Sequence, residues 1–349
     1  SLFLAYTYNL RIMKTTQLKI SLCALLFTLL SCGNDDAKNT GLIVTIEDQF
    51  VNLPSNVSVF FRVEDEAGNG VAGLNENDFT IYENGSKISS FEATRKIQPN
   101  EQVFDYHITL LLDLSGSILG GENLSGLKSA AKSFIDEVVP AENSVNSQAV
   151  KMEIWWFDGS ENIKQLQGTS TNRNTLKAAI DNISPQMSSD NSTNLYGAVI
   201  QGINIAAKKL SQTRQLDEIA SSAVVLFTDG TDQANRNTKG QALEAVKNAD
   251  KDMSIYTIGL GQEIDEATLK AIGKTSFVSA VNIGELLDKF KEIGDLINGK
   301  ANSYYLLEYC SPKRNGSNQL TIEANKGALK GSANTFFDAS DFNGSCSLQ

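Results

Sequence analysis

Histidine is almost absent from this chain, and its absence excludes several enzyme classes. The 349 residues include one histidine, His107, which stands inside an apolar run typical of a buried strand. Neither Ser115 nor Ser117 has a histidine at a plausible partner position, which excludes a serine hydrolase triad. The sequence also lacks a G-x-x-x-x-G-K-[ST] phosphate loop. A metal-assisted hydrolase needs a positioned base; Asp158 or Asp232 could be nominated, but turn positions favour structural roles for both.

Positive charge is also scarce. The chain carries 30 lysines and arginines against 41 aspartates and glutamates, a formal net charge of −11. No basic stripe is apparent that could neutralise phosphates, so nucleic acid is not expected as a partner. The length is sufficient for more than one domain with a good core.

A long apolar run is missing near the start, where residues 20–30 are too short to span a bilayer. Met13 makes a better N-terminus than Ser1, and lysines precede the run as in a secretory signal. The run ends in Leu-Leu-Ser-Cys-Gly at residues 29–33, which resembles a bacterial lipobox. We therefore expect residues 1–32 to be an upstream extension and lipoprotein signal, with Cys32 lipidated. The alternatives are an ordinary signal peptide that contains a cysteine, or a buried helix.

A polar tether, residues 33–41, follows the predicted lipidated cysteine. Its acidic pair, Asp35 and Asp36, resembles the surface-export signal of some bacteria with two membranes, although such a pair also serves solvation. The expected location is the bacterial cell envelope, lipid-anchored to the outer membrane. Surface display and retention facing the periplasm both stay open.

Cysteine is scarce, with four in the chain, and Cys23 would leave with the signal. With Cys32 lipidated, Cys310 and Cys346 remain, and in an oxidising compartment two such residues predict a disulfide. Closing a loop of this length is worth about 3–4 kcal/mol on the chain-entropy model. A thiolate metal site is the alternative, but histidines and close spacing are lacking.

Residues 42–103 alternate in short runs of β-forming residues. The clearest are residues 42–46, 57–63 and 79–82, and Asn84-Gly85 after the last is a strong hairpin signal. Short strands at this spacing predict a β-sandwich module of immunoglobulin-like type.

A long apolar run, residues 104–112, ends in the pattern Asp113-x-Ser115-x-Ser117. Such a run predicts a strand buried on both faces of a parallel sheet. Ligand groups in open α/β sheets gather beyond the carboxyl ends of such strands. The turn would offer oxygen ligands only, as hard divalent cations prefer.

Two further segments supply what such a site would still need. Thr193 stands just before an apolar-periodic helix, and residues 223–228 form a second buried strand that ends at Asp229. In order and spacing these segments resemble the von Willebrand factor A domain across about 200 residues. The resemblance implies a metal-ion-dependent adhesion site with five ligand positions, namely Asp113, Ser115, Ser117, Thr193 and Asp229.

Residues 104–300 alternate strands and helices, which predicts an α/β fold with a doubly wound, mostly parallel sheet. Further strands are expected at 150–157, 254–261 and 277–280, and helices at 124–139, 175–183, 195–210, 241–249, 265–272 and 283–297. Residues 301–349 return to β-forming patterns at 303–309, 319–324 and 332–337. Our hypothesis is that this tail completes the N-terminal β-module, so that the A domain is an insertion. A small appendage stapled by the disulfide is the alternative.

The five candidate ligands also have an ordinary structural explanation. Ser115, Ser117 and Thr193 could cap helices, and Asp229 could belong to an Asp-Gly turn. Five such residues at three strand-end loops favour the metal site instead. Two carboxylates and three hydroxyls suit Mg²⁺, with Mn²⁺ or Ca²⁺ as alternatives.

The resemblance implies a function in metal-dependent protein binding, in adhesion or assembly. An aspartate or glutamate of the partner would complete the metal shell, and the membrane would be contacted through the lipid anchor. The alternatives are an envelope scaffold whose interface lies on the β-module and, less favoured, a metal-dependent hydrolase.

Overall fold

The computed structural model describes residues 41–88, 95–99, 104–120, 123–144, 147–216, 219–344, 346 and 348. The predicted signal, the lipidated Cys32 and the tether up to residue 40 lie outside the described residues. Within the part described, no helix is both long enough and apolar enough to cross a membrane.

The central sheet of the α/β domain has six strands in the order β11-β10-β9-β6-β7-β8. Their bounds are β6 (Phe104–Asp113), β7 (Val150–Phe157), β8 (Lys164–Ser170), β9 (Ile219–Thr228), β10 (Met253–Leu260) and β11 (Ser276–Ala280). All neighbours pair in parallel except β7 and β8, which are antiparallel. This is the mostly parallel, doubly wound sheet that the sequence predicts.

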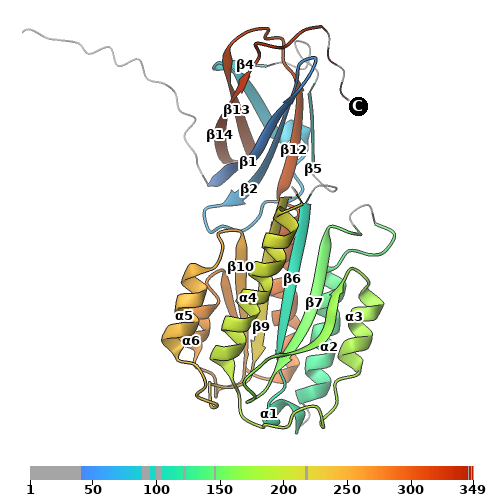
Figure 1. Ribbon diagram of the computed structural model, residues 1–349, viewed down its shortest axis with the longest axis vertical. Helices are drawn as coiled ribbons and strands as arrows, with labels where there is room; N and C mark the ends of the chain where they lie inside the picture. The colour runs from blue at the N-terminus through green and yellow to red at the C-terminus, as the bar shows by residue number, and fades with distance from the viewer. Residues whose placement is uncertain are drawn as a thin grey trace, which may run out of the picture. The chain divides into compact units, whose positions relative to one another are not determined.

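Helices cover both faces of this sheet (Figure 1). The helices are α1 (Gly116–Leu119), α2 (Asn123–Val138), α3 (Arg173–Asp181), α4 (Leu195–Arg214), α5 (Lys239–Asn248), α6 (Glu266–Ile272) and α7 (Leu286–Ala301), the last preceded by the 3₁₀ turn Ile283–Glu285. One core joins α2, α3 and α7 to residues such as Leu110 of β6, while a second joins α4, α5 and α6 to Leu111 of the same strand. Alternate side chains of one strand thus fill two cores.

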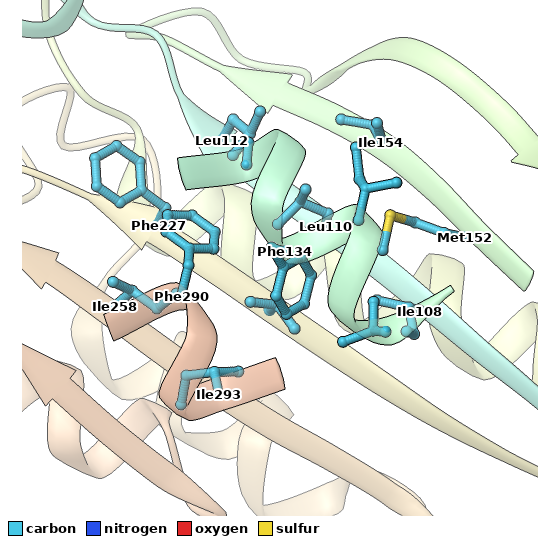
Figure 2. Close-up of a cluster of buried hydrophobic side chains, with 14 of the residues drawn as sticks. Ile108, Leu110, Leu112, Phe134, Met152, Ile154, Phe227, Ile258, Phe290 and Ile293 are labelled. Atoms are coloured by element: carbon cyan, nitrogen blue, oxygen red, sulfur yellow. The ribbon is translucent and has the colours of Figure 1, made fainter. Parts of the chain in front are cut away.

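Aromatic packing holds the first of these cores together. Figure 2 shows Phe134 of α2 and Phe290 of α7 over Leu110 and Ile258 of the sheet. The ring centroids of Phe134 and Phe290 lie 5.6 Å apart, and Phe290 is 5.9 Å from Phe227 at the end of β9. Residues of both helices recur at helical spacing on the buried side, which is why these two helices pair over the sheet.

Two four-stranded sheets form the β-module, in the orders β1-β2-β12-β5 and β14-β13-β3-β4. The strands are β1 (Leu42–Asn52), β2 (Asn56–Asp65), β3 (Phe79–Glu83), β4 (Ser86–Lys87), β5 (Arg95–Pro99), β12 (Tyr304–Cys310), β13 (Ser317–Lys326) and β14 (Leu329–Asp338), with a 3₁₀ turn at Glu76–Asp78. Tyr305 stands opposite Phe61 and Ile322 opposite Ile81, so strands from both ends of the chain share each sheet. The C-terminal segment therefore completes the N-terminal module, and the α/β domain is inserted between β5 and β12.

The predicted disulfide is present in this module. Cys310, the last residue of β12, is bonded to Cys346, 36 residues later. The hairpin turn at Asn84-Gly85 also forms, with positive φ at both residues and pairing of Tyr82 with Lys87. The disulfide fixes the end of β12, and the hairpin turn joins β3 to β4.

Two strands were missed by the sequence patterns. The antiparallel edge strand β8 has the sequence KQLQGTS, and β5 has RKIQP. Neither shows a run of β-branched or aromatic residues, because an edge strand needs little apolar surface. Several predicted ends also shift: α4 continues to Arg214 rather than ending at residue 210, and the predicted helix 283–297 becomes a 3₁₀ turn followed by α7.

Candidate metal centre

The candidate site lies where the sheet reverses its winding direction. Strands β6 and β9 are parallel neighbours, with Leu112 opposite Phe227. From β6 the chain continues to β7 on one side, and from β9 to β10 on the other. Loops diverge at such a point and leave a crevice at the carboxyl ends of the two strands. Asp113 ends β6 and Asp229 directly follows β9.

Asp113 is completely buried, and both its carboxylate oxygens accept hydrogen bonds. The backbone N–H of Ser115 donates to Oδ1 at 2.9 Å, and the hydroxyl of Thr228 donates to Oδ2 at 2.6 Å. Thr228 belongs to β9 and stands directly before Asp229. The first carboxylate is thus fixed from both strands.

The two serines extend this arrangement toward the second carboxylate. The hydroxyl oxygens of Ser115 and Ser117 lie 3.2 Å apart, and Ser117 donates to Oδ1 of Asp229 at 3.0 Å. Ser115 is buried, whereas Ser117 is exposed. One hydroxyl therefore faces solvent at the mouth of the site while the other residues form its floor.

The loop carrying Thr193 lies against the loop after β9. The backbone oxygen of Thr193 accepts hydrogen bonds from the backbone N–H groups of Gln233 at 2.9 Å and Ala234 at 3.1 Å. A Cβ placed on Gly230 would lie 3.8 Å from the hydroxyl oxygen of Thr193. The structure thus brings all five predicted positions to the same end of the sheet.

Helix capping does not account for these hydroxyls. Asn194, not Thr193, is the N-cap of α4, and its side chain accepts from Gly197. Ser115 occupies the N-cap position of α1 but makes no capping hydrogen bond with its side chain. Thr193 is almost fully buried as a residue, and its side chain takes no part in capping α4.

The electrostatics of the site also favour a cation. Burial, together with the nearby charge of Asp229, raises the pKa of Asp113 to about 7, against opposing hydrogen bonds from Thr228 and Ser115. Burial likewise raises the pKa of Asp229, and the charge of Glu263 adds to this. Neither carboxylate forms an ion pair with any described lysine, arginine or histidine. A buried carboxylate and a half-buried one that repel each other would be stabilised by a bound divalent cation.

The donor set fits a hard cation rather than zinc-type ligation. The described residues contain no group of three or more histidine, cysteine, aspartate or glutamate side chains suited to a metal. What the site offers is two carboxylates and three hydroxyls, all oxygen donors, and Mg²⁺ accepts such a set while keeping some of its water. The residues present therefore fit the ion that the sequence pattern implies.

A second layer holds the Thr193 loop in place, and sequence patterns did not reveal it. Arg236 donates from Nε to the backbone oxygen of Gly159 at 2.6 Å, and its guanidinium lies 3.6 Å from the carboxylate of Asp190. Asp190 in turn accepts from the backbone and hydroxyl of Ser192. Arg236 thus ties three loops together, and the only sequence signal for this is an arginine near the end of an otherwise acidic loop.

Asp158 and Asp232, the nominal bases, both have structural roles. Asp158 is buried; burial favours its neutral form, but hydrogen bonds from Ser160, Ser188 and Lys164 outweigh this and lower its pKa. Asp232 accepts from the backbone of Tyr196 at 3.1 Å and of Asn235 at 3.0 Å.

His107 and the tryptophans belong to the packing of the domain. His107 is buried, and its Nε2 lies 2.9 Å from the hydroxyl of Thr213. Burial lowers the pKa of His107 to about 4. Trp156 is buried, with Lys164 4.2 Å from its ring centroid, and Trp155 is partly buried against the α4 side of the sheet.

The fold is an α/β domain, and a cluster of carboxylate and hydroxyl oxygens lies at the switch point of its sheet. The von Willebrand factor type A domain model matches residues 107–293, just over half of the chain. The chain belongs to that family.

Several solved structures are similar to this chain at low identity. Proximal thread matrix protein 1 from the mussel byssus, with zinc in its metal-ion-dependent adhesion site, has a TM-score of 0.45 and 19% identity, covering 57% of this chain and 49% of its own. A von Willebrand factor type A protein from Catenulispora acidiphila has a TM-score of 0.44 and 10% identity, covering 87% and 75%. The corresponding domain of the pilus tip protein Mfa5 from Porphyromonas gingivalis has a TM-score of 0.42 and 12% identity, covering 56% and 95%.

The chain spans about half the length of the mussel protein that it matches. Comparison with curated protein sequences gives no significant match.

Proposed function

We propose that this protein is a metal-dependent protein-binding module that captures a carboxylate of its partner in adhesion or assembly. The observation that carries the proposal is the chain of contacts from Thr228 through Asp113, Ser115 and Ser117 to Asp229. These contacts link two carboxylates and their hydroxyl neighbours, and Ser117 among them is exposed.

Each residue has a distinct part in this proposal. Asp113 and Asp229 would hold the ion directly or through water, while the hydroxyls of Ser115, Ser117 and Thr193 fill further positions. A bound Mg²⁺ supplies an acceptor position for an incoming aspartate or glutamate. Because three of the five donors are neutral, the protein does not oversupply negative charge and the ion stays attractive to that carboxylate. Mn²⁺ suits the same donors, and Ca²⁺, which prefers more ligands, suits them less.

The setting we propose is the bacterial cell envelope, with the protein anchored to the outer membrane through a lipid on Cys32. Support for this comes from the sequence around residues 29–33 and from the acidic tether that follows it. A disulfide between Cys310 and Cys346 accords with an exported protein.

A second candidate is an envelope scaffold whose interface lies on the β-module. It is favoured by large apolar side chains that stand exposed on β14 and around the β1–β2 hairpin, namely Phe336 at 63%, Leu53 at 65% and Phe50 at 45% exposure. In that case the metal would stabilise the fold and the partner would bind elsewhere.

The test combines metal titration with partner capture. Calorimetry should detect one Mg²⁺ site in the protein and none after Asp113→Ala with Ser115→Ala. Envelope or host extracts are then passed over the immobilised protein with Mg²⁺, with chelator, and over the double variant. A matched control, Asp136→Ala with Ser133→Ala, removes the same residue types from the surface of α2.

The outcomes separate the two candidates. Capture of a partner only with Mg²⁺ and only by the protein and the control variant supports carboxylate capture. Equal capture under all conditions contradicts it and favours the β-module as the interface. Absence of Mg²⁺ binding contradicts the metal site itself.

A further inference from the structure

A pocket opens at the carboxyl ends of β10 and β11, on the same edge of the sheet as the metal centre. Its volume is about 450 Å³, and Gly261, Ile264, Ala280 and Val281 form its less polar wall. Ligand pockets generally fall between about 300 and 1,000 Å³, so this one has ample room for a long side chain. None of the five candidate metal ligands lines this pocket.

The pocket lies one strand away from Asp229. Strand β10 pairs with β9 so that Gly259 stands opposite Thr228, the residue before Asp229. Two residues further along, Gly261 donates from its backbone to Ala280 of β11 at 2.8 Å, which closes the floor of the pocket. Adjacent strands are about 4.8 Å apart, so one short peptide can reach both places.

The pocket combines apolar side chains with acidic ones. Val281 is 64% exposed, although it is a large apolar side chain, and it lines the pocket with Ile264. Glu266 stands at the rim of the pocket. Glu263, on the same loop, is close enough for its charge to act on Asp229. Among the described residues neither Glu263 nor Glu266 has a hydrogen bond or ion pair, unlike Asp265, which holds Thr268 and lies 3.7 Å from Lys239.

We propose that this pocket receives a lysine or arginine side chain of the partner, next to the carboxylate that the metal centre captures. The inference rests on the proposed function, whose partner it describes more closely: a segment with an acidic and a basic residue a short distance apart. An aliphatic stem covers the exposed Val281, and the charged head reaches Glu266 at the rim. An acidic side chain would be repelled there, and a purely apolar one would leave the glutamate beside it without a partner.

The first measurement tests the pocket without the metal. L-arginine amide is titrated into the isotope-labelled protein, with L-norleucine amide as a probe of similar apolar stem but no side-chain charge. Saturable shifts of the Gly261 and Val281 amide signals are expected with arginine amide and much weaker ones with norleucine amide. Glu266→Gln should weaken arginine binding about two- to fivefold, as loss of an exposed ion pair does. Glu244→Gln on the surface of α5 is the matched control and should change nothing.

The second measurement joins pocket and metal. Heptapeptides with a central glutamate and random flanks are selected on the immobilised protein, with Mg²⁺ and with chelator. Enrichment of lysine or arginine at one flanking position, lost in Glu263→Gln with Glu266→Gln while binding still requires Mg²⁺, supports the pocket.

Each alternative result has a definite meaning. Mg²⁺-dependent capture with no basic preference, or with a preference unchanged by the double variant, overturns the pocket and leaves the proposed function standing. Capture indifferent to Mg²⁺ overturns the proposed function and, with it, the paired recognition. Absence of arginine-amide shifts at Gly261 and Val281 overturns the pocket independently of both.

Discussion

The hydroxyl of Ser117 donates a hydrogen bond of 3.0 Å to Asp229, 112 residues further along the chain. This contact joins the loop after β6 to the loop after β9 across the switch point of the sheet. Since Asp113 is tied to β9 through Thr228 in the same way, two hydrogen bonds cross the gap in opposite directions. The two hydrogen bonds thus hold the oxygen donors of both loops together, and donors held by the fold lower the ordering cost of the ion binding that we propose.

We predict that Asp113→Asn stabilises the protein in chelator while it abolishes Mg²⁺ binding. The Asp113 carboxylate is fully buried beside Asp229 and has no ion-pair partner among the described residues. Removing its charge should raise the free energy of unfolding at neutral pH by about 1–3 kcal/mol, because burial raises the Asp113 pKa to about 7. Denaturant unfolding with chelator and with Mg²⁺ measures both effects.

The control for this prediction is Asp158→Asn, which should have the opposite sign. Asp158 is equally buried, but its carboxylate accepts from Ser188 at 2.9 Å and from Lys164 at 3.2 Å. Losing a paired buried charge destabilises a protein. If both variants destabilise the metal-free protein alike, the repulsion between Asp113 and Asp229 does not lower its free energy of unfolding.

Arg236→Met should weaken Mg²⁺ binding without removing any ligand. Its guanidinium holds Gly159 and Asp190, which position the loop that carries Thr193. Residues that orient metal ligands typically change affinity 10- to 100-fold, and we expect about 10-fold here, measured by calorimetry. Lys239→Met, at an exposed lysine nearby in the sequence, should leave the affinity unchanged. Equal affinities for the protein and both variants would show that the Thr193 loop is held without Arg236.

Most of the fold follows from the sequence because its central strands are buried on both faces. The runs that end at Asp113 and Asp229 are mostly apolar, with an uninterrupted apolar stretch before each carboxylate end, and a buried parallel strand accommodates such runs best. Edge strand β8 escaped prediction because its two glutamines, lysine and glycine carry no such constraint. The site shows the same division. Four candidate ligands stand at or just after strand ends and Thr193 stands just before a helix, so all five could be predicted. Arg236 instead acts through a contact between loops 77 residues apart that no local pattern encodes.

Stability should fall in acid partly because of His107. Burial lowers its pKa to about 4 in the folded protein, whereas an exposed histidine titrates near 6.5. The unfolded chain therefore binds a proton between these values and the folded chain does not. The contribution is fully present above pH 6.5 and is lost as the pH falls toward 4, amounting to about 3 kcal/mol. Unfolding free energies across this range should show a steeper loss for the protein than for His107→Gln. Parallel curves would mean that His107 takes up its proton without unfolding.

Gly70→Ala should destabilise the protein because the β-module touches the last helix of the α/β domain there. A Cβ on Gly70 would lie 2.4 Å from the backbone oxygen of Gly299 and 2.5 Å from Cα of Lys300. Nearby, Lys300 forms an ion pair of 2.6 Å with Glu64 of β2. Because the atoms that the Cβ would meet belong to the backbone, they can move little, so we expect a loss of about 1–3 kcal/mol in denaturant unfolding. Gly240→Ala, in the first turn of α5, meets its nearest atom at 3.8 Å and should instead stabilise by about 0.5–1 kcal/mol. The same sign for both substitutions would indicate that the loop at Gly70 moves aside freely, and that the contact with α7 contributes little to the junction.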